Sequence, residues 1–264
     1  MSQKPERPQI IKPRVLKGFR DSLPTAEIPK KAIIDRLETL FCSYGFVPID
    51  TPVLEYMEVL LGKGGGETDK QIFHFVDNGG REVAMRFDLT VPFARFLAQH
   101  RRQLPMPFKR FHIDKVWRGE NPQKGRYREF IQCDFDIVGL DTAEADFEIL
   151  SVMDDSFAEI GVKNYRFHLA HRGLFNQMLS HLEIDQHTAE ILRSVDKLRK
   201  IGRDAVQREL VELIEDQEKA GAILTFIDKE DESEPFLVTL ERLERLGGGA
   251  SEHSERMRAI YGYL

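Results

Sequence analysis

The chain has 264 residues, of which 41% are hydrophobic and 31% are charged, and its formal net charge is -6. This balance is typical of a soluble globular protein that is long enough to bury one large core or two smaller ones, and it argues against a protein that coats nucleic acid by bulk charge. No apolar run approaches the roughly 20 residues that cross a bilayer, and the start lacks the pattern of a secretory signal, so we expect a cytoplasmic protein.

The first elements predicted along the chain are a long amphipathic helix and an extended segment. Residues 26–44 carry apolar side chains at helical spacing, with Pro29 tolerated in a first turn and Gly45 suited to a C-terminal cap. Residues 46–54 contain two prolines, which forbid helix and bias their neighbours toward extended structure. The apolar positions of the helix are Ile33, Ile34, Leu37, Leu40 and Phe41.

A glycine-rich turn and a hairpin are predicted next. The turn at Gly62 to Gly66 is either a mobile surface loop or a lid over a ligand. Residues 72–87 are predicted as a β-hairpin, because the Asn-Gly pair within residues 77–80 supplies the positive φ angles of a tight turn.

A second helix and a long pair of strands follow. Residues 89–100 have helical spacing, whereas residues 109–117 and 128–138 are rich in strand-forming residues and are joined by a turn-rich segment at residues 119–125. We expect these two strands to pair in an antiparallel manner, with a basic loop between them.

A third helix is predicted after Thr142, which can cap it, because acidic residues occupy its first turn and an apolar stripe runs along one side. Residues 165–169 are predicted as a short strand, and from about residue 183 the chain is charged and lacks strand patterns. We therefore predict an α+β protein with two domains: residues 1–182, built on an antiparallel sheet flanked by helices, and residues 183–264, a smaller helical module. The stripe consists of Phe147, Leu150, Met153, Phe157 and Ile160.

Basic residues concentrate in a single stretch. From Lys109 to Arg128 there are seven Lys or Arg residues, against only Asp114 and Glu120. Phosphate binding depends on where cations sit, so the acidic total charge does not exclude a local anion site.

Polar side chains also alternate along the second strand of the long pair. Every second residue of a strand faces the same side, so this strand directs a ring, an amide and three charged groups to one face, and Arg118 on the partner strand can face them. A buried face does not hold so many polar groups without partners, which favours a solvent-lined cleft; an exposed, salt-bridged face is the alternative. The set is Arg128, Phe130, Gln132, Asp134 and Asp136.

Four separated segments resemble one enzyme family. Residues 116–136 resemble motif 2 of the class II aminoacyl-tRNA synthetases, and residues 121–130 are close to the form found in histidyl-tRNA synthetases. The other three resemble, in order, that family's opening signature, motif 1 and its amino-acid-binding segment: residues 17–24, the helix and extended segment ending at Pro52, and residues 86–95. The resemblance implies a class II synthetase-type sheet, with residues 183–264 as the family's helical insertion.

Roles in ATP binding follow from this resemblance. Arg118 would contact the α-phosphate, where its planar donors match the charge that develops at phosphorus. Glu120 would meet the adenine side, Arg126 would hold the outer phosphates and Phe130 would stack on the base.

Roles in histidine binding follow from the resemblance as well. Asp88, Thr90 and Gln132 match positions that hold the substrate α-ammonium group, and Leu89 lies within the same segment. Asp136 matches the carboxylate that faces the imidazole ring, where it would accept a ring N–H and reject apolar isosteres.

The implied activity is that of a histidine–tRNA ligase. The histidine carboxylate would attack the α-phosphorus of ATP, which Mg²⁺ usually accompanies, and the adenylate would then acylate tRNA(His). Residues 26–56 would form a homodimer interface, although the helix in this range could instead pack only on its own sheet.

Two features set limits on this interpretation. The family's histidine-segment arginine, motif 3 and anticodon-binding domain are not found before Leu264, so we expect a truncated chain with weak or no aminoacylation. Neither the eight histidines nor the two cysteines have metal-ligand spacing, so no metal site is predicted, and Cys42 and Cys133 are expected to be reduced and mostly buried.

Two alternatives of other classes remain. One is a regulatory subunit of ATP phosphoribosyltransferase that resembles a synthetase and binds histidine without needing ATP, although such subunits generally lose the motif 2 charges that are intact here. The other is an RNA-binding module that uses the basic loop, which the acidic total charge disfavours.

Overall fold

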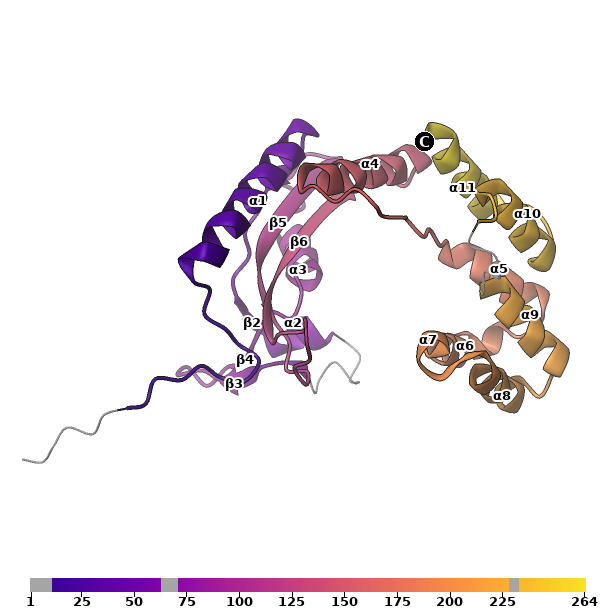
Figure 1. Ribbon diagram of the computed structural model, residues 1–264, viewed down its shortest axis with the longest axis horizontal. Helices are drawn as coiled ribbons and strands as arrows, with labels where there is room; N and C mark the ends of the chain where they lie inside the picture. Colours follow the sequence, from indigo (N-terminus) through magenta and orange to yellow (C-terminus); the bar gives the residue numbers. More distant parts are fainter. Residues whose placement is uncertain (1–10, 63–70, 228–232) are drawn as a thin grey trace, which may run out of the picture. The chain divides into compact units, whose positions relative to one another are not determined.

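The computed structural model describes residues 11–62, 71–227 and 233–264 and confirms the α+β class (Figure 1). By its internal contacts the chain divides into two compact units, one of residues 1–140 and 149–163 and the other of residues 141–148 and 164–264. The boundary predicted at residue 183 differs from this division and stays a prediction. Residues 63–66 of the glycine-rich turn lie outside the described residues.

The first unit contains two sheets and four helices among its described residues. Its elements, in chain order, are α1 (Pro24–Ser43), β1 (Val47–Pro48), β2 (Leu54–Tyr56), α2 (Met57–Leu61), β3 (His74–Val76), β4 (Glu82–Met85), α3 (Thr90–His100), β5 (Phe108–Trp117), β6 (Glu129–Val138) and α4 (Ala143–Glu159), whose first six residues are grouped with the second unit.

The main sheet has the order β1-β5-β6, with β1 parallel and β6 antiparallel to β5. The predicted long antiparallel pair is therefore confirmed. One face of this sheet packs against α1 and α4 (Figure 1). The core there is built by Phe41 of α1, Phe46, Phe111 of β5 and Val152 of α4, all nearly inaccessible to solvent, and burying such side chains stabilises the fold by about 1.5–3 kcal/mol each.

The predicted helix of residues 26–44 is confirmed as α1, but it begins earlier, at Pro24. Proline suits a first helical position because its missing N–H would have no partner there. The early start places Pro29 inside the helix rather than in its first turn, where it cannot donate the usual backbone hydrogen bond.

The smaller sheet has the order β2-β4-β3 and packs with α2 around Leu60, Ile72 and Ala84. The predicted hairpin is confirmed, but its turn is longer than the Asn-Gly pair indicated. Val76 pairs with Glu82, so the loop has five residues, and its positive φ falls on Gly80. Asp77 organises this loop, because its Oδ1 accepts hydrogen bonds from the backbone N–H groups of Gly79 and Arg81.

The second unit is helical throughout its described residues, apart from connecting loops. Its elements after the start of α4 are α5 (Arg172–His181), the 3₁₀ helix η2 (Asp185–His187), α6 (Thr188–Val195), α7 (Leu198–Ile201), α8 (Arg203–Ile214), α9 (Gln217–Ile227), α10 (Phe236–Leu246) and α11 (Glu252–Tyr263). Among all described helices, none combines the length and the apolarity that a membrane span requires.

Two predictions about local structure are wrong. Residues 165–169 form no strand, because no described strand lies beside them to complete their backbone hydrogen bonds, and strand propensity depends on such a neighbour. Both cysteines are exposed rather than buried. Cys42 follows the buried Phe41 and turns away from the sheet, since successive helical residues differ by about 100° in direction, and Cys133 lies on the edge strand β6.

Candidate active site

The face of the main sheet opposite α1 is polar. In the register of β5 and β6, Arg110 pairs with Asp136, His112 with Asp134, Asp114 with Gln132, and Val116 with Phe130. Paired residues project to the same side of a sheet, so the predicted alternation of Phe130, Gln132, Asp134 and Asp136 on one face is confirmed.

Arg118 lies directly after β5 and is brought to this face. Its backbone N–H donates to the carbonyl oxygen of Arg128, which continues the pairing of the two strands past their ends. Its side-chain Nε donates to the carbonyl oxygen of Phe87 at 3.0 Å, and its Cζ lies 5.1 Å from the ring centre of Phe130. These contacts fix the guanidinium plane, and no described residue accepts a hydrogen bond from its two terminal amino groups.

The loop between the strands is a tight turn. Gln123 and Arg126 exchange backbone hydrogen bonds, and Gly125 takes the positive φ of +81° that this turn requires. The predicted phosphate ligand Arg126 is exposed, with Nη1 4.0 Å from Glu120 Oε2. Glu120 and Arg126, both predicted to contact ATP, are therefore neighbours.

The base of this loop is held by Arg128. Its Nε donates to the carbonyl oxygen of Glu120 at 3.0 Å, and its backbone N–H donates to the carbonyl oxygen of Gly18. A Cβ atom at Gly18 would lie 2.8 Å from the Arg128 side chain, and Gly18 has a φ of +88°. Arg128 therefore ties the opening segment of the chain to the loop.

The predicted histidine-binding segment lies at the start of α3. Oδ1 of Asp88 accepts a hydrogen bond from the backbone N–H of Val91, and burial raises the pKa of Asp88 despite that bond and the nearby charge of Arg118. Thr90 is exposed, whereas Leu89 is fully buried, so the structure does not present Leu89 to a substrate as it does Thr90.

Several buried polar groups on the polar face lack hydrogen-bond partners within the described parts of the chain, among them both ring nitrogens of His112. Oε1 of Gln132 is shielded from solvent and has no hydrogen-bond partner among the described residues. The same holds for Nε, Nη1 and Nη2 of Arg110, a residue with no exposed surface. A buried polar group without a hydrogen bond costs about 1–3 kcal/mol, which makes Oε1 of Gln132 a candidate for contact with a ligand, whereas Nη2 of Arg110 lies against Asp136.

Arg110 forms an ion pair with Asp136 across the strands, and its Cζ lies 4.0 Å from the ring centre of Phe93 on α3. Burial lowers the pKa of Arg110, while Asp136 and Asp134 oppose this shift. Asp134 lies on the same face, and burial raises its pKa against the effect of Arg110.

A second buried arginine, Arg86, lies at the β1 side of this face. Its Nη2 is 2.5 Å from Asp114 Oδ2, and its Nη1 and Nε donate to the carbonyl oxygens of Thr51 and Lys115. Arg86 therefore connects the segment that leads to α3 with the β5 strand and with the segment after β1.

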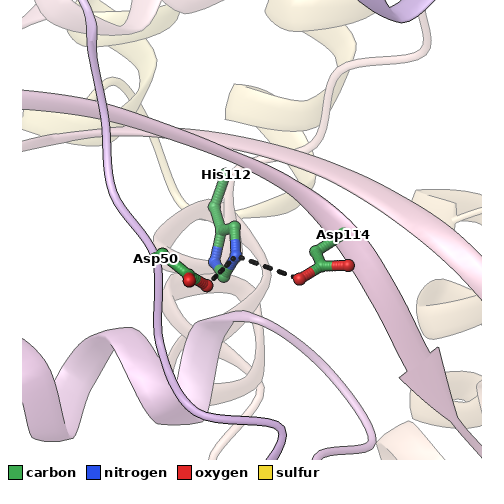
Figure 2. Close-up of side chains that lie close together, drawn as sticks. All are labelled: Asp50, His112 and Asp114. Carbon is green, nitrogen blue, oxygen red and sulfur yellow. Dashed lines mark ion pairs between the residues drawn. The ribbon is translucent and has the colours of Figure 1, made fainter. Parts of the chain in front are cut away.

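Asp50, His112 and Asp114 bring two carboxylates and a ring nitrogen within 4.8 Å of one another (Figure 2). His112 Nε2 lies 3.5 Å from Asp50 and 3.9 Å from Asp114. A cation fits poorly here, because Arg86 already pairs with Asp114 Oδ2 and the backbone N–H of Lys115 donates to Asp114 Oδ1. Burial, with the nearby charge of Arg86, lowers the pKa of His112, which favours a neutral ring.

Sequence reasoning missed Arg110 and Arg86. A signal for Arg110 was present: counting back from Arg118 in steps of two along the preceding strand reaches Asp114, His112 and Arg110, all on the face of Arg118. Arg86 begins the segment that resembles the family's amino-acid-binding segment, but its partners come from two other parts of the chain, so its buried position could not be predicted.

Comparisons with known proteins point to one family. The family model described as histidyl-tRNA synthetase matches residues 18–263. The histidine–tRNA ligase of Treponema denticola is 55% identical over 258 residues, which make up 97% of this chain and 57% of that protein. The chain therefore spans little more than half the length of this relative.

Two solved structures resemble this one. A histidyl-tRNA synthetase from Nostoc sp. PCC 7120 matches with a TM-score of 0.81 and 26% identity over 96% of this chain and 58% of its own. A protein from Bacillus halodurans described as an ATP phosphoribosyltransferase regulatory subunit/histidyl-tRNA synthetase matches with a TM-score of 0.77 over 96% of this chain and 65% of its own. At 23% identity, the second likeness shows the fold alone.

Proposed function

The chain belongs to the histidyl-tRNA synthetase family, and from this premise we propose that it carries the part of a histidine–tRNA ligase that binds histidine and ATP. The complete activity would be ATP-dependent formation of histidyl-adenylate and transfer of histidine to tRNA(His). Since the chain spans 57% of its Treponema denticola relative, this activity is proposed for the protein that contains the chain and residue roles are proposed for the chain itself.

One observation carries the proposal: the polar face of β5 and β6 holds buried polar atoms that no described residue satisfies. Oε1 of Gln132 is an acceptor, and it lies on the face that also carries the carboxylates Asp134 and Asp136. An acceptor beside carboxylates suits an ammonium group and a ring N–H, which are the two donors of neutral histidine.

Histidine would be held from both ends. Asp88, Thr90 and Gln132 would bind the α-ammonium group, and Asp136 would accept the ring N–H. Burial raises the pKa values of Asp88 and Asp134 because it removes water from their carboxylates. A cationic ligand at this face would stabilise the charged carboxylates and so offset that loss.

The reacting atoms would be held by Arg118. The histidine carboxylate would attack the α-phosphorus of ATP, and pyrophosphate would leave, so no protein nucleophile is needed. The terminal amino groups of Arg118 would donate to the α-phosphate oxygens, where negative charge grows as the new bond forms. Because Phe87 already fixes the plane of its guanidinium, little reorganisation would be required.

The rest of ATP would be held by the loop and the strand after it. Phe130 would stack on adenine, Glu120 would meet its edge, and Arg126 would contact the outer phosphates, a role that its exposed position in the turn supports. Mg²⁺ bound with ATP would neutralise part of the phosphate charge.

A homodimer through residues 26–56 belongs to the proposal. Apolar side chains in this range remain exposed in the single chain, which favours an interface with a second copy over packing on the chain's own sheet alone. They are Ile28, Ile33, Val47, Val53, Leu54 and Tyr56. Analytical ultracentrifugation would show whether the dimer forms. We also propose that the protein is located in the cytoplasm, where tRNA is charged.

The proposal is tested by titrating the chain with histidine and with ATP in a calorimeter. We expect both to bind, Gln132→Ala to weaken histidine, and Arg118→Ala to weaken ATP. The matched controls Gln103→Ala and Arg101→Ala change exposed residues away from the site and should bind both ligands as the wild type does. Binding of histidine without ATP would favour a regulator, and binding of RNA without either ligand would favour an RNA-binding module.

A further inference from the structure

We propose that Arg110 makes this chain bind histidine with a neutral rather than a protonated imidazole ring, because its buried guanidinium balances the charge of the Asp136 carboxylate. The inference rests on the proposed function, in which Asp136 faces the ring. It concerns a specificity-determining residue outside the four segments that carry the family resemblance.

Arg110 is fixed in place. Its side chain has no exposed surface, it is the cross-strand partner of Asp136, and its guanidinium pairs with that carboxylate while lying 4.0 Å over the ring of Phe93. A buried guanidinium between a strand partner and an aromatic ring cannot swing into solvent. The positive charge therefore stays beside Asp136 whether or not a ligand is bound.

Asp136 nevertheless keeps room for a ligand. Its side chain is 39% exposed, although its Oδ2 pairs with Nη2 of Arg110. The carboxylate can thus accept a ring N–H as a dipole while its net charge is already balanced. An imidazolium ring would meet the guanidinium as a like charge, so the neutral ring is preferred.

The other titratable groups near this pair are Asp134, His112 and Asp88. Burial favours the uncharged form of each, because it raises the pKa of both carboxyl groups and lowers the pKa of the histidine. These shifts weaken the carboxyl groups of Asp134 and Asp88 as sources of negative charge. Arg110 is the cation that pairs directly with Asp136, so a ring that faces Asp136 would meet its charge.

The test measures the affinity for histidine from about pH 5 to pH 8, across the ordinary imidazole pKa near 6.5. Triazolylalanine, whose ring stays neutral over this range, is titrated in parallel, so that the affinity ratio of the two ligands removes any effect of protein groups such as Asp88. For the wild type, we expect the affinity for histidine, divided by the affinity for triazolylalanine, to fall about tenfold for each pH unit below the imidazole pKa. A ratio that is flat or rises in acid overturns the inference.

Two substitutions assign the effect to Arg110. Arg110→Met keeps an apolar contact with Phe93 but removes the charge, so the acid loss should shrink or reverse. Arg110→Lys keeps the charge and should keep the acid loss. Identical profiles for the wild type and Arg110→Met would overturn the inference. If Arg110→Met does not fold, as thermal unfolding would show, Arg110→Gln, which also removes the charge, takes its place.

Failure of the proposed function gives a different result. A folded wild-type chain that binds neither histidine nor triazolylalanine at any pH refutes the histidine site itself. Binding of both ligands with a ratio that does not change with pH leaves the proposed function intact and refutes only the role of Arg110. The affinity for ATP, measured on the same samples, should be the same in the wild type and in both Arg110 variants.

Discussion

The two faces of the main sheet differ in what their side chains do. On one face, Phe111 and Phe135 pack with Phe41 of α1 and Val152 of α4 in a closed apolar core. On the other face, Gln132 and Arg110 keep buried polar atoms without hydrogen-bond partners among the described residues. Alternate residues of β5 and β6 thus face opposite sides of the sheet, and this separates a face that packs in the core from a face that holds buried polar groups without hydrogen-bond partners in the described part of the chain.

The difference teaches that stability and binding can be altered separately in this unit. Substitutions on the apolar face should lower the free energy of unfolding. They should weaken ligand binding only to the extent that the protein unfolds. Substitutions of the partly exposed side chains on the polar face, such as Gln132 and Asp136, should change binding while the fold persists.

The largest expected effect is that of Phe41→Ala. Phe41 has no exposed surface and contacts Phe111 and Phe135 at ring-centre distances of 5.4 Å and 5.1 Å. The cavity should lower the free energy of unfolding by about 3–5 kcal/mol, measured by urea denaturation. Cys42→Ala, at the exposed neighbouring position, serves as the control and should cost far less. An equal loss at both positions would contradict the division between the faces.

The next largest effect is expected for Arg118→Ala, which should reduce activity rather than stability. Losing the donors at the α-phosphate should lower histidine-dependent exchange of pyrophosphate into ATP by about 10²–10³-fold in the protein that contains the chain. The urea midpoint should shift little, because the Arg118 side chain makes one backbone hydrogen bond. Full exchange activity in this variant would remove Arg118 from its proposed role.

Gly18→Ala should have an intermediate effect. The positive φ of +88° costs an L residue about 1–2 kcal/mol, and the new Cβ would also press on Arg128. Gly161→Ala is the matched control, since Gly161 has a φ of +80° but open space around a Cβ. If Gly18→Ala weakens ATP binding and Gly161→Ala does not, Arg128 transmits the change to the loop; equal ATP binding by both variants would separate Gly18 from the site.

The smallest effect is predicted for the pH dependence of stability in Asp88→Asn. Burial raises the pKa of Asp88 in the folded state, so its contribution to stability is fully present below the unfolded pKa near 3.9 and is lost as pH rises through the folded pKa. Asparagine can still accept the Val91 N–H but carries no charge. The ligand-free variant should therefore gain stability over the wild type as pH rises toward 7, as thermal unfolding at several pH values would show.

Most elements could be predicted from the sequence because their signals are local. The long strand pair, the helix after Thr142 and the hairpin near Asp77 each follow from spacing and turn residues within a short window. The strand predicted at residues 165–169 failed for the opposite reason. A strand is completed by a partner elsewhere in the chain, and the local composition of five residues contains no information about that partner.

By itself, the sequence determined the alternation that places Gln132, Asp134 and Asp136 on one face, since that pattern needs only an extended backbone. Only the tertiary structure decided which cations meet those groups. In the sequence, Arg110 is one of seven basic residues between Lys109 and Arg128. In the structure, strand pairing places it opposite Asp136, and its contact with Phe93 helps to bury it. The physical reason is that a charge acquires its strength from burial and from its neighbours, both of which long-range packing creates.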